Sequence, residues 1–136
     1  MSKILAISEA NAIAFHGMAV IAGSKTAINA TNLAKRIGAS RHHVSKVFQK
    51  LVKAGFLSST RGPSGGFMLR KKPEEITLFE IYETIEGNIT INPCPIDKIK
   101  CPFSKCMLGG ICYELAEKFL IYMKENNLKK VINNIM

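Results

Sequence analysis

Acidic residues are missing from a long stretch of this chain. Between Glu9 and Glu74 the sequence contains no Asp or Glu, yet residues 25–72 carry eleven Lys and Arg. After Lys72 the balance reverses, with nine acidic residues against seven basic ones. A cationic surface without acids attracts a polyanion, because none of its side chains repels phosphate. This charge pattern favours a nucleic-acid partner, and a solvated basic surface is the simpler alternative.

The sequence also lacks an apolar run long enough to cross a membrane. Its most hydrophobic segment, residues 12–23, is interrupted by His16 and Gly17, and Glu9 and Asn11 precede it. These features suit neither a transmembrane helix nor the core of a signal peptide. We therefore expect a cytoplasmic protein with no membrane partner. A chain of 136 residues is expected to fold around a single core.

Arrangements typical of enzymes are missing as well. We find no nucleophile with a base at a useful spacing, no phosphate-binding glycine loop and no paired acids. Internal repeats and low-complexity segments are not present either. The sequence therefore favours a binding protein over an enzyme.

The basic stretch contains the pattern of a helix-turn-helix. Residues 31–37 predict a short helix that ends at Gly38, and Ser40 is a good N-cap for a helix that runs to Ala54. The predicted buried face of this second helix consists of Val44, Val47, Phe48 and Leu51. The opposite face and the N-terminal tip carry side chains that hydrogen-bond bases and phosphates: Ser40, Arg41, His42, Ser45, Lys46, Gln49 and Lys53. An amphipathic surface helix without DNA-binding function would have the same pattern.

A β-hairpin is predicted directly after this helix. FLSST (residues 56–60) and FMLRKK (residues 67–72) have the composition of strands, and RGPSGG between them is typical of a turn. A hairpin in this place forms the wing of a winged helix. Its tip carries Arg61 and Ser64, and its small residues allow the backbone to approach a DNA groove closely.

Further helices are predicted on both sides of this unit. Residues 8–22 predict a helix that starts at Ser8, and residues 77–86 predict another. The first of these is expected to bury Ile13, Ala14, Met18 and Ile21. Residues 108–124 predict a long helix, and LKKVINNI predicts a short final one. The apolar stripe of the long helix consists of Leu108, Ile111, Leu115, Phe119 and Met123.

These elements give the expected fold class and domain organisation. A helix as long as residues 108–124 in so small a protein usually packs against a second copy. The fold is therefore expected to be mainly α with a small β-wing, a winged helix-turn-helix plus a long C-terminal dimerisation helix. We expect a DNA-binding domain over 1–87, a cysteine-rich loop over 88–107, and the dimerisation and tail helices over 108–136.

All four cysteines lie in one short segment, with the spacing Cys94-x6-Cys101-x4-Cys106-x5-Cys112. Structural zinc sites usually contain close pairs such as C-x2-C, and none is present. Disulfides suit an oxidising compartment only. Iron–sulphur clusters accept irregular spacing, because each thiolate binds a different corner of a larger object. A cluster is therefore favoured, with zinc, a disulfide, haem ligation through a Cys-Pro pair and chance as alternatives.

The segment GASRHHVSKVFQKLVKAGFLSSTRGPSGGFMLRKKPEEITLFEIYETIEG resembles the winged-helix core of the iron–sulphur regulators IscR and NsrR. Its most specific tract is AGFLSSTRGPSGGFML, followed by the helix that begins with IT and ends with EG. With the long C-terminal helix and its Phe119-Leu120 pair, the resemblance covers nearly the whole chain. It implies a homodimeric transcription factor, a repressor or an activator, that binds a palindromic operator in double-stranded DNA. It also implies that a 2Fe–2S or 4Fe–4S cluster senses redox, nitric oxide or iron status.

The resemblance extends to the DNA-binding positions with one departure. Ser45 stands where the family's recognition helix can carry a base-selecting Glu, so the operator sequence does not follow from the family. The DNA contacts are expected from Ser40, Arg41, His42, Lys46, Gln49, Lys53, Arg61 and Ser64.

The family uses three cysteines as ligands, whereas this chain has four. Cys101, Cys106 and Cys112 have the x4 and x5 spacings that some NsrR-like members show. Measuring back from Phe119-Leu120 instead places the third ligand at Cys106, and this register is the longer measure. The expected thiolate ligands are therefore Cys94, Cys101 and Cys106. Cys112 is then a small buried apolar residue, or a spare ligand or resolving thiol.

A fourth ligand is still required. Relatives take it from a His just past the third cysteine, or from a carboxylate at the start of the first helix of the other subunit. The His position is Gly109 here, and Glu9 lies where the carboxylate is expected. An acid at a helix start is also favoured by the helix dipole alone. His16 is expected to pack in the core rather than to bind iron.

Two other functions remain open. A cluster-free winged-helix regulator would use thiol oxidation, zinc, haem or a small ligand as its signal. An iron–sulphur carrier or enzyme subunit would leave the basic wing unexplained.

Overall fold

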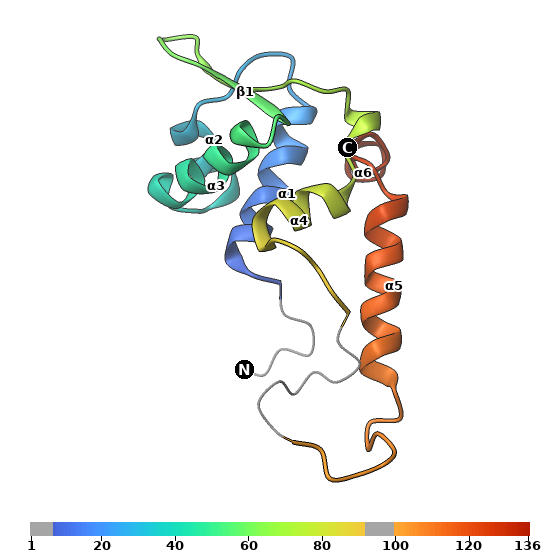
Figure 1. Ribbon diagram of the computed structural model, residues 1–136. Helices are drawn as coiled ribbons and strands as arrows, with labels where there is room; N and C mark the ends of the chain where they lie inside the picture. The colour runs from blue at the N-terminus through green and yellow to red at the C-terminus, as the bar shows by residue number, and fades with distance from the viewer. Residues whose placement is uncertain (1–6, 92–99) are drawn as a thin grey trace.

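The computed structural model describes residues 7–91 and 100–136 (Figure 1). The N-terminal helices are α1 (Glu9–Ala22), α2 (Ala30–Ile37) and α3 (Arg41–Lys53). The strands β1 (Leu57–Thr60) and β2 (Gly66–Leu69) follow, then a 3-10 turn η1 (Pro73–Glu75) and helix α4 (Leu78–Glu86). Helices α5 (Ile111–Glu125) and α6 (Leu128–Ile135) end the chain. This order confirms the expected fold class, which is mainly α with a small β-wing.

Hydrogen-bonding side chains fix where the N-terminal helices begin. Each of three polar residues before a helix accepts a hydrogen bond from the backbone N–H three positions later, which satisfies a donor that the helix itself cannot pair. These caps are Ser8 before α1, Asn29 before α2 and Ser40 before α3. Gly38 then closes α2 in the left-handed conformation, with φ of 70°. A tight turn between α2 and α3 results.

The core of the winged helix lies between α1 and α3. The four apolar residues predicted to form the inner face of α3 are all buried: Val44, Val47, Phe48 and Leu51. Gly17 of α1 faces this helix so closely that a Cβ there would lie 2.2 Å from Phe48 Cζ. The two helices are therefore in direct contact, with no room for a side chain at this point.

The wing is attached to the helix-turn-helix by a further strand contact. β1 and β2 pair antiparallel from Leu57↔Leu69 to Thr60↔Gly66. Ile28, just before α2, donates to and accepts from the backbone of Phe67 at 3.2 and 2.8 Å. The second strand is shorter than predicted and ends at Leu69, because the chain turns into η1 at Pro73.

Helix α5 begins three residues later than predicted. Gly109 and Gly110 have φ of 62° and 77°, and a right-handed helix does not pass through this conformation. The apolar stripe of the helix is also divided. Phe119 and Met123 pack toward α4, where Phe119 meets Tyr82 edge-to-face at 5.8 Å, whereas Ile111 and Leu115 remain 47% and 46% exposed.

The last helix returns to the winged-helix unit. Leu128 N–H donates to Ile76 C=O and Leu78 N–H donates to Asn126 C=O, both at 2.9 Å. Leu128 is fully buried, and α6 packs against η1 and α1. None of the described helices is both long and apolar enough to cross a membrane.

Candidate nucleic-acid interface and cysteine segment

The side chains predicted to contact DNA lie on the outer surface of α3 and on the wing. The predicted positions are all exposed: Ser40, Arg41, His42, Lys46, Gln49 and Lys53 on and just before α3, and Arg61 and Ser64 on the wing. Ser45 is half-buried. The wing tip and α3 lie on the side of the molecule opposite α5 (Figure 1). These side chains therefore belong to one side of the fold, which carries polar and basic groups.

A basic hollow beside α2 was not predicted from the sequence. It has a volume of about 440 Å³ and opens broadly to solvent. Its polar lining consists of Ser24, Thr26, Asn32, Lys35 and Arg36. Hydroxyl, amide and cationic groups of this kind bind phosphate oxygens. The only signal for it in the sequence was the count of bases, because the two hydroxyl residues lie in a loop of no distinctive pattern.

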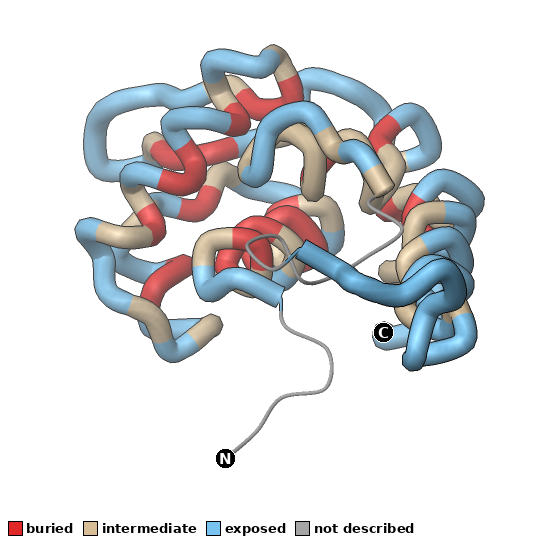
Figure 2. Tube along the Cα trace, turned by 60° about the horizontal axis from the view of Figure 1, so that its bottom comes forward, coloured by how far each residue is buried: buried red, intermediate tan, exposed pale blue. Residues whose placement is uncertain are grey.

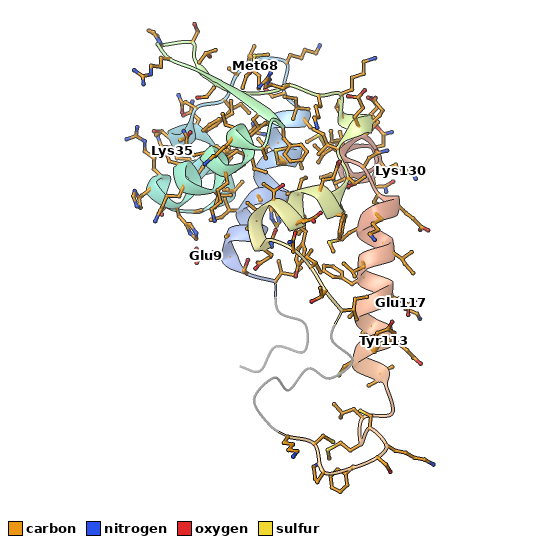
Figure 3. All side chains as sticks on the ribbon, in the orientation of Figure 1. Glu9, Lys35, Met68, Tyr113, Glu117 and Lys130 are labelled. Carbon is orange, nitrogen blue, oxygen red and sulfur yellow. The ribbon has the colours of Figure 1, made fainter. Side chains whose placement is uncertain are left out.

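The first turn of α1 contacts α3. Glu9 Oε1 lies 3.6 Å from His43 Nδ1, and the Glu9 side chain is 77% exposed. Figure 3 shows Glu9 at the start of α1, far from Glu117 and Tyr113 on α5. In this chain the candidate iron ligand Glu9 therefore has α3 as its neighbour.

The same turn of α1 is held by the last residue of α4. Ser8 Oγ donates to Glu86 Oε1 at 2.6 Å, and Asn11 Nδ2 donates to the same oxygen at 2.8 Å. Asn11 is completely buried, and its Oδ1 has no hydrogen-bond partner among the residues that the structure describes. Burying an amide in an apolar core is unfavourable unless it is paired, so Glu86 provides the bond that stabilises Asn11 there.

Residues 100–110, which carry Cys101 and Cys106, lie at the far end of the molecule from the wing (Figure 1). Cys101 and Cys106 are exposed free thiols, and Cys94 falls outside the described residues. Within residues 7–91 and 100–136, no three His, Cys, Asp or Glu side chains lie close enough together to hold a metal ion. The described part of one chain therefore does not bring Glu9 together with Cys101 and Cys106.

Three backbone N–H groups lie near the exposed thiol of Cys106. The N–H groups of Gly110, Leu108 and Gly109 lower the pKa of Cys106, because hydrogen bonds to a thiolate favour the charged form. Gly109 and Gly110 both have positive φ, a backbone conformation found in anion-binding nests. A lowered pKa increases the fraction of Cys106 that is present as thiolate, the form that binds metals and reacts with electrophiles.

Two expectations about single residues are corrected by the structure. His16 is exposed rather than in the core, and its Nδ1 lies 2.7 Å from Ala12 C=O. Cys112 lies in the first turn of α5 and is half-buried, because this end of the helix extends beyond the core.

A family model described as "Rrf2: Iron-dependent Transcriptional regulator" matches residues 7–134. The chain belongs to the Rrf2 family. Among curated Rrf2-like relatives, the transcriptional regulator NsrR of Geobacillus kaustophilus is 30% identical over 98 residues, which cover 68% of this chain and 64% of that protein. The chain spans about two thirds of the length of the curated relatives it matches. The resemblance seen in the sequence is confirmed at the level of the family.

Solved structures support the Rrf2 fold. CymR, the global cysteine regulator of Bacillus subtilis, superposes with a TM-score of 0.75 at 21% identity, covering 98% of this chain and 100% of that one. IscR of T. potens superposes with a TM-score of 0.76 at 20% identity, covering 98% and 90%. At these identities the likeness shows a shared fold.

Proposed function

We propose that this Rrf2-family chain is a homodimeric DNA-binding transcriptional regulator. Its α3 and wing bind a palindromic operator, and an iron–sulphur cluster reports redox, nitric oxide or iron status. The observation that carries the DNA-binding part is the outer face of α3, where basic and hydrogen-bonding side chains are exposed above a fully buried apolar face. No acidic residue occurs between Glu9 and Glu74 to weaken contact with phosphates.

Each part of this surface has a distinct role in the proposal. The N-terminal end of α3, with Arg41 and His42, enters the major groove and contacts base edges. Lys53 at the other end of α3 contacts the phosphate backbone, which gives affinity without sequence preference. Arg61 at the wing tip contacts a neighbouring groove, where the glycines beside it keep the wing thin.

The exposed apolar side chains of α5 support a homodimer. Ile111, Leu115, Ile121 and Tyr122 are all exposed in the single chain. Contiguous apolar surface of this kind usually marks an interface. A second copy that packs along α5 would cover these side chains and place two recognition helices on one palindrome, because a twofold axis relates both.

The donor set fits an iron–sulphur cluster in its chemistry. The proposed ligands are Cys94, Cys101 and Cys106, with Glu9 of the other subunit as the fourth and Cys112 as a less favoured alternative. The nest around Cys106 stabilises the thiolate that ligation requires. A bound cluster would supply a centre that reacts with oxidants or nitric oxide. The iron bound by the carboxylate would be held less tightly than one bound by a thiolate.

A cluster-free regulator is the second candidate. Exposure and a lowered pKa also make Cys106 suitable for reversible oxidation, which would serve as a signal without iron. Zinc, haem or a small ligand would be further signals in such a protein. The neighbour CymR, named as a cysteine regulator, shares the fold of this chain.

Anaerobic purification followed by visible spectroscopy tests the sensor. A brown protein with charge-transfer bands is expected, and Cys94→Ala, Cys101→Ala and Cys106→Ala should each abolish the colour. Glu9→Ala should retain a cluster with a shifted spectrum that bleaches faster in air, and Cys112→Ala should change little. A colourless wild-type protein that still binds DNA tightly would instead support the cluster-free regulator.

A DNA duplex selected from a random library with the wild-type protein tests the operator contacts. Arg61→Ala should weaken binding to this duplex by about 1–3 kcal/mol, the usual value for a groove contact. Unchanged affinity would exclude the wing from the interface.

A further inference from the structure

We propose that Glu86 is a positioning residue that couples the cysteine segment to the recognition helix, acting through Ser8 and Asn11 in the first turn of α1. The nature of the signal rests on the proposed function. The coupling itself runs through contacts within one described chain.

Glu86 occupies the point where the cysteine segment leaves the folded domain. It is the last residue of α4, and Gly87 after it has φ of 86° and ψ of −165°, which turns the chain sharply away from the helix. Residues 88–91 then lead toward the segment that contains Cys101 and Cys106. A rearrangement that displaces residues 88–91 therefore acts next on Gly87 and Glu86.

Glu86 is bound at this point to α1 and to no other described element. Its Oε1 accepts hydrogen bonds from Ser8 Oγ and Asn11 Nδ2, two donors on the first turn of α1. Ser8 is also the N-cap of that helix, because its Oγ accepts from Asn11 N–H at 3.1 Å. Movement of Glu86 therefore changes both the cap of α1 and the hydrogen bond that joins the buried Asn11 side chain to a described residue.

The other end of the cysteine segment reaches the same helix. Phe119 of α5 packs edge-to-face on Tyr82 of α4, and Tyr82 stacks on Phe15 of α1 with ring centroids 6.4 Å apart. Both ends of the segment, α4 and α5, are thus joined to the first two turns of α1. A shift of either α4 or α5 would therefore displace these two turns.

Helix α1 is in turn closely packed on the recognition helix. Gly17 allows the ring of Phe48 to lie directly against the α1 backbone, and packed interiors transmit displacement because they compress little. At the end of the helix, Glu9 lies 3.6 Å from His43, in the first turn of α3. A shift of α1 therefore changes the position of the residues that are proposed to contact bases.

Hydrogen–deuterium exchange tests this coupling in the full chain, with Glu83→Ala as the matched control. Glu83 is a carboxylate on the same helix, and its side chain forms no hydrogen bond to a described residue. In iron-free protein, Glu86→Ala should increase amide exchange in residues 9–14 and also in residues 41–47 of α3. Glu83→Ala should leave both segments at the wild-type rate.

A second variant separates coupling from loss of stability. Glu86→Ala leaves the whole Asn11 amide unpaired, whereas Asn11→Leu/Glu86→Ala removes both polar partners and should fold with nearly wild-type stability. This double variant should also show increased exchange in α3. Faster exchange confined to residues 9–14 and 84–91 in both variants, with α3 unchanged, would overturn the coupling.

Reconstitution with ferrous iron and sulphide under reducing conditions tests whether cluster loading reaches α3 through Glu86. Loading should alter exchange in α3 of the wild type, and both Glu86 variants should keep the visible absorption but lose this response in α3. A response of wild-type size in the variants would overturn the coupling and leave the cluster in place. A wild type that binds no iron and sulphide would overturn the proposed sensor, while the iron-free comparison would still decide the role of Glu86.

Discussion

The winged-helix unit and the cysteine-bearing end of this chain differ in how completely they are folded by their own residues. Residues 9–86 contain nearly all of the buried positions, whereas residues 100–110 and much of α5 are exposed (Figure 2). The helices of the first unit begin at side-chain caps, but α5 begins after two glycines and without such a cap. The apolar side chains of the first unit are buried against one another, whereas several on α5 are left exposed by the residues that the structure describes.

Apolar side chains therefore have different roles in the two regions. Burial of apolar area stabilises the winged helix in the single chain, because each inner face meets another inner face. The same kind of side chain on α5 stabilises the protein only when a partner covers it. Substitutions of one type, made in both regions, should therefore have effects on different measurements.

The largest difference is expected for a matched pair of leucines. Leu51→Ala should lower the free energy of unfolding by about 2–5 kcal/mol, because Leu51 is fully buried and the change leaves a cavity. Leu115→Ala, on the exposed face of α5, should change the unfolding of the monomer little and should weaken dimerisation. Denaturant titration measures the first effect, and sedimentation of a dilution series measures the second.

The contrast between the leucines has a clear negative outcome. Equal loss of stability in both variants at concentrations where the protein is monomeric would mean that α5 is covered by its own chain. A dimerisation constant unchanged by Leu115→Ala would place the interface elsewhere.

A smaller effect is expected from adding a methyl group to the core. Gly17→Ala should destabilise the protein by about 1–3 kcal/mol, because the new Cβ meets the ring of Phe48 and one of the two helices must shift. Thermal unfolding measures the change. Gly23→Ala is the control, since the group near its Cβ is the flexible end of the Met136 side chain. A similar loss of stability in both variants would mean that α1 and α3 can move apart at little cost in free energy.

Local sequence patterns predicted the winged helix because its structure is determined by local chemistry. The spacing of Val44, Val47, Phe48 and Leu51 identifies one face of a helix, and Ser40 and Gly38 mark its limits, without knowledge of any distant residue. The position of His16 was predicted wrongly for the converse reason. Periodicity gives the faces of a helix, but not which edge its neighbours leave uncovered.

Contacts between distant residues could not be predicted in the same way. Asn11 and Glu86 are separated by 75 positions, and no local pattern in the sequence pairs an asparagine just before an apolar run with so distant a carboxylate. The start of α5 was missed because the conformation of Gly109 and Gly110 does not follow from their identity. The ligand set of the cysteine segment stays a prediction, since it involves Cys94 and a second subunit.

A pair of exposed lysines sharpens the comparison for DNA binding. Lys53→Ala should reduce the slope of log affinity against log salt by about one, because one phosphate contact is lost. Lys118→Ala removes the same charge from α5 and should leave the slope unchanged. Fluorescence anisotropy with a labelled duplex over a range of salt concentrations measures both, and equal slopes in the two variants would remove α3 from the interface.

The smallest effect concerns the nest around Cys106, the one feature of the exposed region that its own backbone constructs. The N–H groups of Gly110, Leu108 and Gly109 lower the pKa of Cys106, so its thiolate fraction at a given pH exceeds that of an ordinary cysteine. The rate of alkylation by iodoacetamide should therefore rise at lower pH than in a synthetic peptide of residues 103–109, which ends before Gly110. Mass spectrometry of the modified segment gives both profiles.

Gly110→Ala should shift the alkylation profile of the protein to higher pH, because φ of 77° is unfavourable for alanine and the Gly110 N–H is displaced. Coinciding profiles for protein and peptide would show that the segment around Cys106 has no fixed structure without a partner, and the contrast between the two regions would then be greater than the structure indicates.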